Sequence, residues 1–367
     1  MKVLHLHKLT GVSGSEGHLL ALLPALRERG IDARFLGLDV PGSDAPRFYA
    51  ALDELGVPHR SVRCGPDVSA RMARDVVRAI RAERPELLHT HLVHADAYGG
   101  LGARLLGVPL VSTRHNDDRY LLGPFRYVDR AFARPARRLI AISDAVRRFL
   151  ERAGHDPAKL VTIRYGLDEL PSARSDPIPA AAGIPADAPL ALAVGRLIAQ
   201  KDHATLLRAF ARVRSALPHA QLAILGSGPL EAETRALARE LGLEHAVTLP
   251  GRTDIRDWLE RADVFVHTSR WEGFGIVLLE AMLAGLPVVA TRVSAVPEVV
   301  ADGETGMLVE AGDVDALAGA LEALLTDRDR ARAIGEAGRR RARAEFSVAR
   351  MAERTQAVYD DATVATR

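Results

Sequence analysis

The stretch "DVFVHTSRWEGFGIVLLEAMLAGLPVVAT", residues 263–291, contains an apolar strand, a loop, a helix and a second apolar strand. The first strand pattern runs to Ser269, and Gly273 and Gly275 free the backbone of the loop that follows. The segment "IVLLEAMLAG" predicts a helix that ends at Gly285, because glycine is favoured just past a helix end. A strand, a helix and another apolar strand in this order predict a βαβ unit of a parallel sheet.

The same alternation of short apolar runs and helical patterns continues through both halves of the chain. A helix is expected over residues 16–30, and strands are expected over residues 3–7, 33–38, 86–91, 108–114, 138–143, 190–195, 220–225, 263–269 and 286–291. Residues 165–190 are rich in Pro, Ala, Ser and Asp and have no clear period, which indicates a linker or domain boundary. The sequence therefore predicts an α/β protein with two doubly wound units, whose ligands bind beyond the carboxyl ends of the strands and in the cleft between the units.

The composition excludes several classes of protein. The 49 basic and 47 acidic residues leave a formal net charge of +2, without the concentrated basic face of a nucleic-acid-binding protein. Cys64 is the only cysteine, so neither a disulfide framework nor a cysteine zinc site is expected. No stretch approaches 18 uninterrupted apolar residues, and the start lacks the apolar region of a signal peptide. We therefore expect a soluble cytoplasmic protein.

Two glutamates, Glu272 and Glu280, lie in the stretch that predicts the βαβ unit. Paired carboxylates can perform acid–base chemistry on a sugar bond, or they can bind a ligand between them. Glu272 belongs to the loop and Glu280 to the first helical turns, with the main-chain amides of Phe274, Gly275 and Ile276 at the helix start. Helix-start amides bind anions, and carboxylates accept hydrogen bonds from sugar and ribose hydroxyls. We interpret the stretch as a site for a nucleotide and a sugar.

Two cations follow the strand that ends at Gly195. Arg196 comes directly after the strand and Lys201 comes five residues later, beside the start of the next helix. Fixed positive charge near a helix N-terminus suits a diphosphate, although both could be ordinary surface charges. Only four residues of the chain are lysines, which favours a functional Lys201.

Two glycine-rich turns lead into helices. "LTGVSGSEG" (9–17) contains Gly14, whose backbone can approach an anion, and "LGSGPLEAE" (225–233) contains Gly228. The second turn lacks the third glycine of a dinucleotide fingerprint, so NAD binding is not supported. A plain strand-to-helix turn remains an equal alternative to a nucleotide site there.

Polar residues also end the strands of the first half. His89, His91 and His94 are loosely spaced for a metal site, and His5 and His7 share one face of the first strand. Lining of a core or cleft is the more plausible role for them. Arg114, His115 and Asn116 follow another strand, and of the histidines His115 is the strongest candidate for binding or chemistry. Asp313 and Asp315 could hold a divalent metal, but we expect a helix cap instead.

These residues together resemble the retaining glycosyltransferases of family 4, which have the two-Rossmann GT-B fold. "EGFGIVLLE" matches the family's E-x7-E element, and "VGRLIAQKD" matches its G-R-x4-K element. "SGSE" is similar to its G-G-x-E turn, with Ser13 in place of the first glycine. The resemblance covers nearly the whole chain. It departs at "YGLD" (165–168), where Tyr165 replaces the asparagine that the family often has.

The resemblance implies a role for each matched residue. Arg196 and Lys201 would hold the donor diphosphate and stabilise the leaving group, Gly14 would offer backbone to the phosphates, and Glu280 would bind the ribose. Glu272, with the amides of Phe274, Gly275 and Ile276 nearby, would bind the donor sugar, and Arg252 would lie at the base. His115 would lie near the donor sugar and the reacting centre, which makes it a catalytic candidate with Arg196, Lys201 and Glu272. Gly228 is a further donor-site candidate, and His91, His94, Arg114 and Asn116 are the acceptor-site candidates.

The resemblance also implies an acceptor-binding domain over residues 1–168, joined by a C-terminal helix over about 348–367, and a nucleotide-sugar-binding domain over residues 169–347. Transfer would retain the anomeric configuration and need no cofactor or metal. We expect a UDP-sugar donor, with a GDP-sugar as the alternative, and an unidentified acceptor in glycolipid or cell-surface polysaccharide synthesis. A nucleotide-sugar epimerase and a non-catalytic nucleotide-sugar-binding subunit are the competing hypotheses.

The segment "HNDDRYLLGPFRYVDRAFARPARRL" (115–139) mixes arginines with aromatic and apolar residues. Such a segment can bind an anionic membrane peripherally, at the inner face, for a lipid-linked acceptor. An ordinary amphipathic helix is the interpretation that we favour for this segment.

Overall fold

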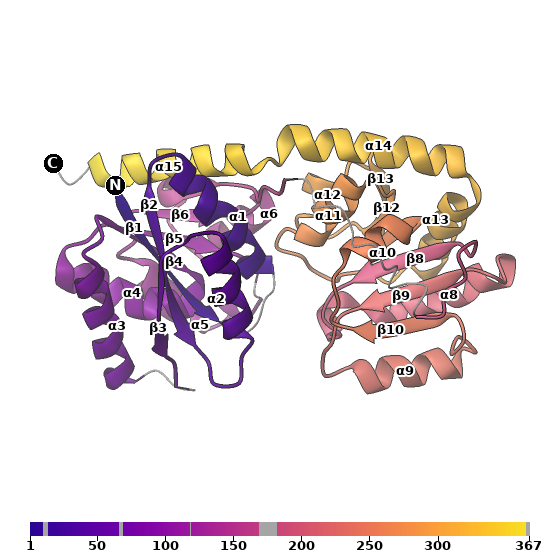
Figure 1. The fold of residues 1–367 in the computed structure, drawn as a ribbon, viewed down its shortest axis with the longest axis horizontal. Helices are drawn as coiled ribbons and strands as arrows, with labels where there is room; N and C mark the ends of the chain where they lie inside the picture. The colour runs from indigo at the N-terminus through magenta and orange to yellow at the C-terminus, as the bar shows by residue number, and fades with distance from the viewer. Residues whose placement is uncertain (10–13, 66–68, 118, 169–181, 365–367) are drawn as a thin grey trace. The chain divides into compact units, whose positions relative to one another are not determined.

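A computed structural model of the chain describes residues 1–9, 14–65, 69–117, 119–168 and 182–364 (Figure 1). Ser13 and residues 169–181 of the expected linker lie outside these ranges. The chain divides into two compact units, Met1–Leu167 with Phe346–Arg367, and Asp168–Glu345. These limits lie within two residues of the domain boundaries expected from the sequence.

The first unit is built on a seven-stranded parallel sheet with the order β3-β2-β1-β4-β5-β6-β7. Its strands are β1 (Lys2–Leu9), β2 (Asp32–Asp39), β3 (His59–Arg63), β4 (Leu87–His91), β5 (Leu110–Arg114), β6 (Arg138–Ala141) and β7 (Leu160–Thr162). The strand order reverses between β1 and β4, which is where a doubly wound sheet forms its ligand crevice.

Helices cover both faces of this sheet. They are α1 (Gly14–Glu28), α2 (Ala45–Glu54), α3 (Ala70–Glu83), α4 (Leu92–Leu106), α5 (Phe125–Ala133), α6 (Asp144–Arg152) and α15 (Val348–Val364), with the 3-10 turns η1 (Arg119–Leu122) and η2 (Pro157–Lys159). The C-terminal helix α15 packs beside α1 (Figure 1), and α15 buries Met351 and Tyr359 in this unit. The expected return of the C-terminal helix to the N-terminal domain is therefore confirmed.

The second unit has a six-stranded parallel sheet with the order β10-β9-β8-β11-β12-β13. Its strands are β8 (Leu190–Val194), β9 (Gln221–Leu225), β10 (Val247–Gly251), β11 (Val264–His267), β12 (Val288–Thr291) and β13 (Gly306–Val309). Its helices are α8 (His203–Ala216), α9 (Glu231–Glu240), α10 (Arg256–Arg261), α11 (Ile276–Ala284), α12 (Val296–Val299), α13 (Val314–Thr326) and α14 (Arg328–Glu345), with the 3-10 turn η3 (Ala199–Lys201). The strand order reverses between β8 and β11, so both units confirm the predicted doubly wound architecture.

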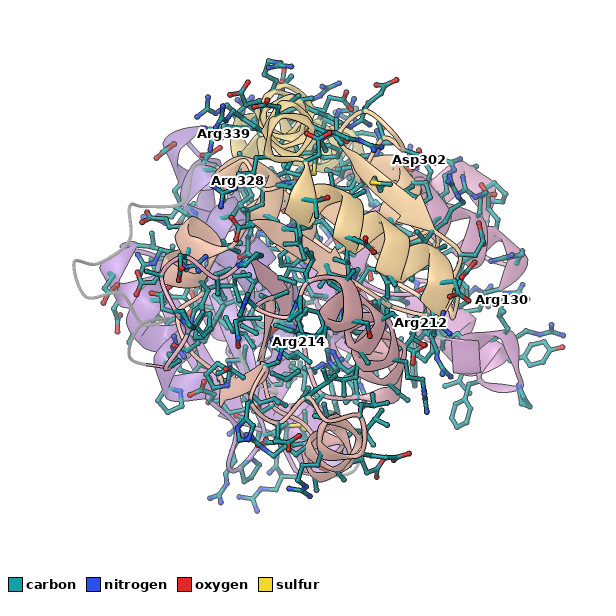
Figure 2. The ribbon with its side chains drawn as sticks, turned by 90° about the vertical axis from the view of Figure 1, so that its right-hand side faces the viewer. Arg130, Arg212, Arg214, Asp302, Arg328 and Arg339 are labelled. Carbon is teal, nitrogen blue, oxygen red and sulfur yellow. The ribbon has the colours of Figure 1, made fainter. Side chains whose placement is uncertain are left out.

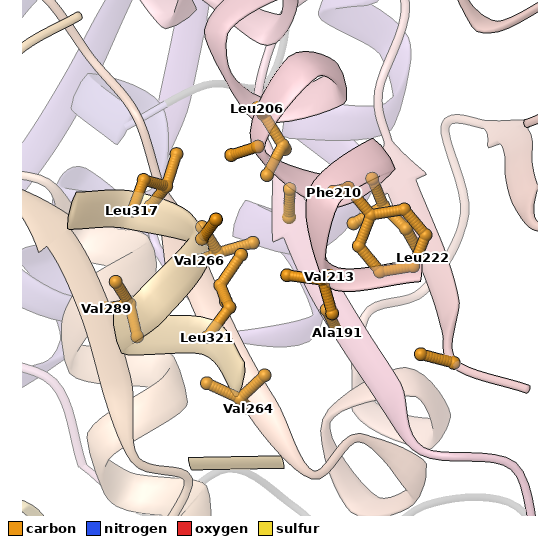
Figure 3. Close-up of a cluster of buried hydrophobic side chains, with 14 of the residues drawn as sticks. Ala191, Leu206, Phe210, Val213, Leu222, Val264, Val266, Val289, Leu317 and Leu321 are labelled. Carbon is orange, nitrogen blue, oxygen red and sulfur yellow. The ribbon is translucent and has the colours of Figure 1, made fainter. Parts of the chain in front are cut away.

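The core of the second unit lies between this sheet and helices α8 and α13 (Figure 3). Leu206 and Phe210 of α8 and Leu317 and Leu321 of α13 are completely buried there. Full burial of such a side chain stabilises the fold by about 1.5–3 kcal/mol. This packing holds β8 and β11 rigidly, and the loops that follow these two strands carry the candidate site.

The basic run at residues 339–343 has a structural role that the sequence did not reveal. Arg339 on α14 (Figure 2) donates from Nε and Nη2 to the main-chain oxygens of Leu283 and Ala284, at 3.0 and 2.5 Å. These oxygens end α11, where positive charge and hydrogen-bond donors are favourable. The guanidinium of Arg339 therefore caps the end of α11.

Asp313 confirms the expected helix cap. Its Oδ1 accepts a hydrogen bond of 2.9 Å from the main-chain nitrogen of Ala316 at the start of α13. Asp315 pairs instead with Arg212 of α8, which lies at the surface (Figure 2). Among the described helices, none combines the length and the apolar character needed to cross a bilayer.

The packing of α14 against the end of α11 leads to a stability prediction. A Cβ on Gly335 of α14 would lie 2.0 Å from the main-chain oxygen of Gly285. Gly335→Ala must therefore push the two helices apart, and we expect it to lower the free energy of unfolding by about 2 kcal/mol or more. In a thermal denaturation this corresponds to a fall in Tm of about 4 °C or more.

Gly319→Ala is the matched control, because Gly319 lies exposed inside helix α13, where an added methyl group would meet no atom within 4 Å. We expect that variant to gain up to about 1 kcal/mol, since alanine is the better helix former. Equal Tm values for the two variants would contradict the close packing of α14 on α11.

Candidate functional site

The loops after β8 and β11 meet through an ion pair. Lys201, the last residue of η3, places Nζ 2.5 Å from Oε2 of Glu272, and both side chains are almost buried, at 14% and 12% exposure. The sequence assigned Lys201 to a diphosphate and Glu272 to a sugar, and the structure brings the two side chains into direct contact. Because β8 and β11 flank the reversal of strand order, the pair lies where a doubly wound sheet binds ligands.

Further donors surround the same carboxylate oxygen. Oε2 of Glu272 lies 3.0 Å from Nε2 of His267 and accepts a 3.1 Å hydrogen bond from Oγ of Ser269. Burial alone would raise the pKa of Glu272, but the charge of Lys201 and the His267 hydrogen bond hold that pKa well below its usual range. Oε1 has no partner within the described part of the chain, so a ligand hydroxyl can donate to it.

His267 and Ser269 were not predicted from the sequence. Their signal was the polar run "HTS" (267–269) at the end of an otherwise apolar strand. Polar side chains in that position face the ligand edge of a parallel sheet.

Arg196 supplies a second cation at the carboxyl end of β8. Its side chain is exposed, and no ion pair of Arg196 occurs among the described residues. Its main-chain oxygen accepts a 3.3 Å hydrogen bond from His203, whose pKa burial lowers to about 4. A Cβ at Gly195 would contact the Lys201 side chain at 3.3 Å, so Lys201 packs across the end of the strand. Among the described residues, the positive charge of Lys201 is thus neutralised by Glu272, whereas that of Arg196 is not neutralised by a carboxylate.

Gly226 and Gly228 are required by packing. A Cβ on Gly226 would lie 2.0 Å from the main-chain oxygen of Gly195, and one on Gly228 would lie 2.4 Å from that of Leu197. The main-chain nitrogen of Leu197 also donates to the oxygen of Ser227 at 3.0 Å. The glycines therefore let the loops after β8 and β9 touch, and the contact of Gly228 with a donor stays a prediction.

Glu280 offers a carboxyl group without a protein partner among the described residues. It lies on the second turn of α11, which begins after Gly275 at a φ of 83°, and its side chain is half-buried. Burial raises the pKa of Glu280 to about 7, and the charge of Asp254 contributes. The amides of Phe274, Gly275 and Ile276 lie at the start of α11, as the sequence predicted. Arg252 follows β10 and is exposed.

Histidines fill the corresponding edge of the first unit. The register of β1 and β4 pairs His5 with His89 and His7 with His91, so the four side chains lie on one face of the sheet. His18 of α1, His115 after β5 and Tyr359 of α15 are in ring contact with members of this group. Tyr359 is 270 residues from its partner His89, and nothing in the sequence indicated this contact.

Three of these histidines come close enough to suggest a metal site. One ring nitrogen from each of His5, His89 and His91 lies within 4.8 Å of the others. Zinc bonds of about 2.0–2.1 Å would need ligand nitrogens about 3.3 Å apart. Both ring nitrogens of each of the three histidines already have hydrogen-bond partners. The cluster therefore does not fit a metal ion as it stands.

Arg114 is placed away from the other acceptor candidates. Its guanidinium is 2% exposed and pairs with Asp96 of α4 and with Asp129 of α5, the latter at 2.7 Å. Successive residues of a strand point to opposite faces, so Arg114 faces α4 and α5 while Thr113 faces the histidines. The expectation that Arg114 contacts an acceptor is corrected: its charge is neutralised inside the unit.

The remaining candidates lie at the carboxyl edge of the first sheet. His91 ends β4 and is completely buried, whereas His94 is exposed on the first turn of α4. Asn116 follows His115 in the loop after β5, and Gly14 is the first residue of α1. Their predicted contacts with an acceptor or a donor phosphate stay predictions.

Comparisons with known proteins agree with these features. The family model described as glycosyl transferases group 1 matches residues 175–341, and the model described as glycosyltransferase family 4 matches residues 12–169. Alpha-maltose-1-phosphate synthase of Mycolicibacterium smegmatis is 32% identical and spans 94% of this chain and 95% of its own length. Phosphatidyl-myo-inositol mannosyltransferase of Mycobacterium leprae is also 32% identical, over 85% of this chain and 83% of its own.

The fold is shared with solved structures. Anabaena Alr3699/HepE, solved in complex with UDP and glucose, has a TM-score of 0.86 at 24% identity, and the match covers 98% of this chain and 100% of that one. Because both halves of the chain match family models and a relative spans nearly all of it, the chain belongs to glycosyltransferase family 4 and is a glycosyltransferase with the GT-B fold.

Proposed function

We propose that the protein transfers a sugar, with retention of configuration, from a nucleotide-diphosphate sugar to a hydroxyl acceptor. One observation carries the proposal. The loops and helix that follow β8 and β11 carry the Lys201–Glu272 pair, together with Arg196 and Glu280, whose side chains have no partner in the described part of the chain. This edge therefore offers cations for a diphosphate and carboxylate oxygens for hydroxyl groups.

The cations are suited to the leaving group. Departure of a nucleoside diphosphate develops negative charge, and preorganised positive groups stabilise that charge. The Lys201 ammonium has three N–H groups, of which one donates to Glu272. Its remaining N–H groups and the guanidinium of Arg196 would bind the diphosphate oxygens without a metal ion. The amides at the start of α11 would add donors to the same phosphates.

The two glutamates would bind hydroxyls and would not transfer protons. Oε1 of Glu272 would accept a donor-sugar hydroxyl while three donors hold Oε2 in place. Glu280 would accept from the ribose. On one face of the sugar, the bond from C1 to the diphosphate oxygen would break as the bond from C1 to the acceptor oxygen forms. The departing diphosphate oxygen would take the acceptor's proton, which gives retention without a protein nucleophile.

The relatives support particular substrates. The Anabaena structure holds UDP and glucose, which supports a UDP-sugar donor, with a GDP-sugar as the alternative. The mannosyltransferase from Mycobacterium leprae is named for phosphatidyl-myo-inositol, which supports a lipid-linked acceptor. An epimerase would instead convert the donor sugar without an acceptor, and incubation with donor alone tests for that product.

The two cations should behave differently when each is removed. A thermal-shift panel of UDP-, GDP-, ADP- and dTDP-sugars should show one nucleotide that stabilises the wild-type protein. Arg196→Ala should keep the Tm of the ligand-free protein, because Arg196 is exposed and has no ion pair among the described residues, but should lose most of the ligand-induced shift. Lys201→Ala should also lower the ligand-free Tm, since it leaves a nearly buried carboxylate uncompensated.

The double variant Lys201→Met/Glu272→Gln tests the stability effect, because it removes both charges of the ion pair. Its ligand-free Tm should return to the wild-type value, but the variant should not release nucleoside diphosphate from the donor. Wild-type-like turnover in Lys201→Ala would overturn the diphosphate assignment, and a panel without any stabilising nucleotide would overturn the proposed function.

The pKa of Glu280 gives a pH prediction. Burial raises this pKa from 4.5 in the unfolded chain to about 7 in the folded chain. Between pH 4.5 and pH 7, the carboxyl group is therefore deprotonated in the unfolded chain and still protonated in the folded chain. The free energy of unfolding then falls as pH rises, by about 1.4 kcal/mol per unit at most, and partial exposure reduces this. Glu280→Gln lacks the effect. Its Tm should rise relative to wild type between pH 5 and 7, with no further change above pH 8.

Glu244→Gln is the control for this measurement, because Glu244 is an exposed carboxylate in the same unit. Its Tm difference from wild type should not depend on pH. Parallel pH profiles for wild type and Glu280→Gln would show that Glu280 is not held neutral by burial.

An exposed apolar surface supports peripheral membrane contact. Leu122 of η1 and Phe125, Tyr127 and Val128 of α5 are 40%, 62%, 60% and 44% exposed. Arg130 on the same helix is also exposed (Figure 2). Apolar side chains beside cations are typical of segments that bind anionic lipid surfaces. This surface would bring the protein to a lipid-linked acceptor.

Flotation with phosphatidylserine-containing vesicles tests this contact. The wild-type protein should float with the vesicles, and Phe125→Ser/Val128→Ser should remain in the lower fraction. Leu55→Ser is the control, because Leu55 is a 42% exposed apolar residue that follows α2. If the wild-type protein stays below the vesicles at low salt, the membrane contact is wrong.

A further inference from the structure

Seven side chains of the first unit form one continuous chain of hydrogen bonds. We propose that this chain, here named the histidine relay, forces its four histidines into one shared tautomer and thereby fixes the ring of His115 at the carboxyl edge of β5. The members, in order, are Thr113, His89, Tyr359, His5, His91, His115 and Tyr165.

The contacts at the α15 end use both ring nitrogens of His89. Nε2 of His89 lies 2.7 Å from Oγ1 of Thr113, and Nδ1 lies 2.6 Å from the hydroxyl of Tyr359. The same hydroxyl lies 3.3 Å from Nε2 of His5. Tyr359 thus connects β4 to β1 from the helix that packs above them.

The contacts continue from β1 to the loop after β5. Nδ1 of His5 lies 3.1 Å from Nε2 of His91, and Nδ1 of His91 lies 3.0 Å from Nε2 of His115. Nδ1 of His115 is hydrogen-bonded to the hydroxyl of Tyr165. In every step between two histidines, Nδ1 of one ring faces Nε2 of the next.

The four imidazoles are held neutral. Burial and the charge of nearby His18 lower the pKa of His5 to about 3. Burial, with contributions from neighbouring histidines, also holds the pKa values of His89, His91 and His115 well below 6.5. A neutral imidazole has one N–H donor and one acceptor nitrogen.

The shared tautomer follows from this geometry. If His91 carries its hydrogen on Nδ1, it donates to Nε2 of His115, which must then carry its own hydrogen on Nδ1. The same requirement passes through His5 and, by way of the Tyr359 hydroxyl, to His89. Between two histidines, a mixed arrangement would oppose two N–H groups or two lone pairs across about 3 Å. At Tyr359 it would leave either the hydroxyl hydrogen or one ring nitrogen without a partner within the relay. In both cases a buried hydrogen bond would be lost. All four histidines therefore carry the hydrogen on Nδ1, or all four carry it on Nε2.

The Thr113 end selects between these two states. Thr113 is buried, and among the described residues its hydroxyl contacts only Nε2 of His89. If His89 donated, the hydroxyl hydrogen of Thr113 would have no acceptor, and unpaired buried donors are rarer than unpaired buried acceptors. Thr113 therefore donates to Nε2 of His89. Each of the four histidines then carries its hydrogen on Nδ1, and His115 donates to the oxygen of Tyr165.

The consequence for His115 rests on the proposed function and on the family resemblance, which implies that this residue lies near the donor sugar. Both of its ring nitrogens are engaged within the relay, so the ring cannot turn when a ligand enters. Tyr165 and Tyr359 are then positioning residues that act through His115. The ring of Tyr165 also stacks on His18, with centroids 4.4 Å apart. Tyr165 stands where the family often has an asparagine, and it is thus the last member of the relay.

Long-range ¹H–¹⁵N NMR of histidine-labelled, EDTA-treated protein at pH 7 tests the shared tautomer. Single His→Gln variants assign the signals. The four relay histidines should all show a protonated Nδ1 and an unprotonated Nε2. Tyr359→Phe should alter the signals of His5 and His89, whereas Tyr49→Phe, which removes a hydroxyl bonded to Asp39 in the same unit, should alter none of the four. Mixed tautomers, or a doubly protonated ring among the four, would overturn the relay.

Kinetics test the positioning role separately. With the donor identified by the thermal-shift panel, Tyr165→Phe and Tyr359→Phe should each lower kcat by about tenfold, with donor KM within about twofold. Tyr49→Phe should change neither constant. Unchanged kcat in both relay variants would overturn the positioning role. Absence of any stabilising donor would overturn the proposed function while leaving the NMR result valid.

Titration with Co²⁺ separates the relay from a metal site. The relay predicts no visible absorption band attributable to ligand coordination and unchanged histidine signals, because the ring nitrogens of His5, His89 and His91 are hydrogen-bonded to one another and to Tyr359, Thr113 and His115. Stoichiometric Co²⁺ binding that depends on His5 would overturn the relay in favour of a metal centre.

Discussion

The ion pair between Lys201 and Glu272 is the constraint on which the second unit's ligand edge depends. It joins the loops after two neighbouring strands, and removal of one partner from such a nearly buried pair costs about 3–5 kcal/mol. Three further bonds repeat the connection: Gln200 to the oxygen of Trp271, Thr268 to the oxygen of Lys201, and Arg270 to Asp202. These bonds hold the two loops against each other.

The two units share a doubly wound topology but place different kinds of side chain at the reversal of strand order. Each sheet reverses its strand order beside its first strand, and each places polar side chains at the carboxyl ends there. The second unit uses full charges, which suit the diphosphate of a donor. The first unit uses neutral imidazoles held by hydrogen bonds among themselves and to Tyr359. These buried imidazoles connect β1, β4 and α15 inside the unit.

The sequence predicted the central strands of both sheets and missed β3, β7, β10 and β13. These four are the edge strands. A central parallel strand is covered on both faces and reads as an apolar run, whereas an edge strand can remain partly exposed. β3, with the sequence "HRSVR", has no fully buried residue, so no apolar run marks it. β13 is mostly buried, so exposure does not explain why it was missed.

The charged residues of the candidate site were predictable from the sequence, whereas His267, Ser269 and the contacts between the residues were not. Lys201 and Glu272 were each recognised from local sequence, yet they are 71 positions apart, and only the adjacency of β8 and β11 brings them together. Arg114 was misassigned because successive residues at a strand end point to opposite faces of the sheet. The sequence alone does not show that the side chain of Arg114 points to the face where Asp96 and Asp129 lie. Local patterns identify the chemistry of a residue, whereas strand order decides its partner. For Glu272 the strand order supplies Lys201 as a partner, and Oε2 is also held by His267 and Ser269.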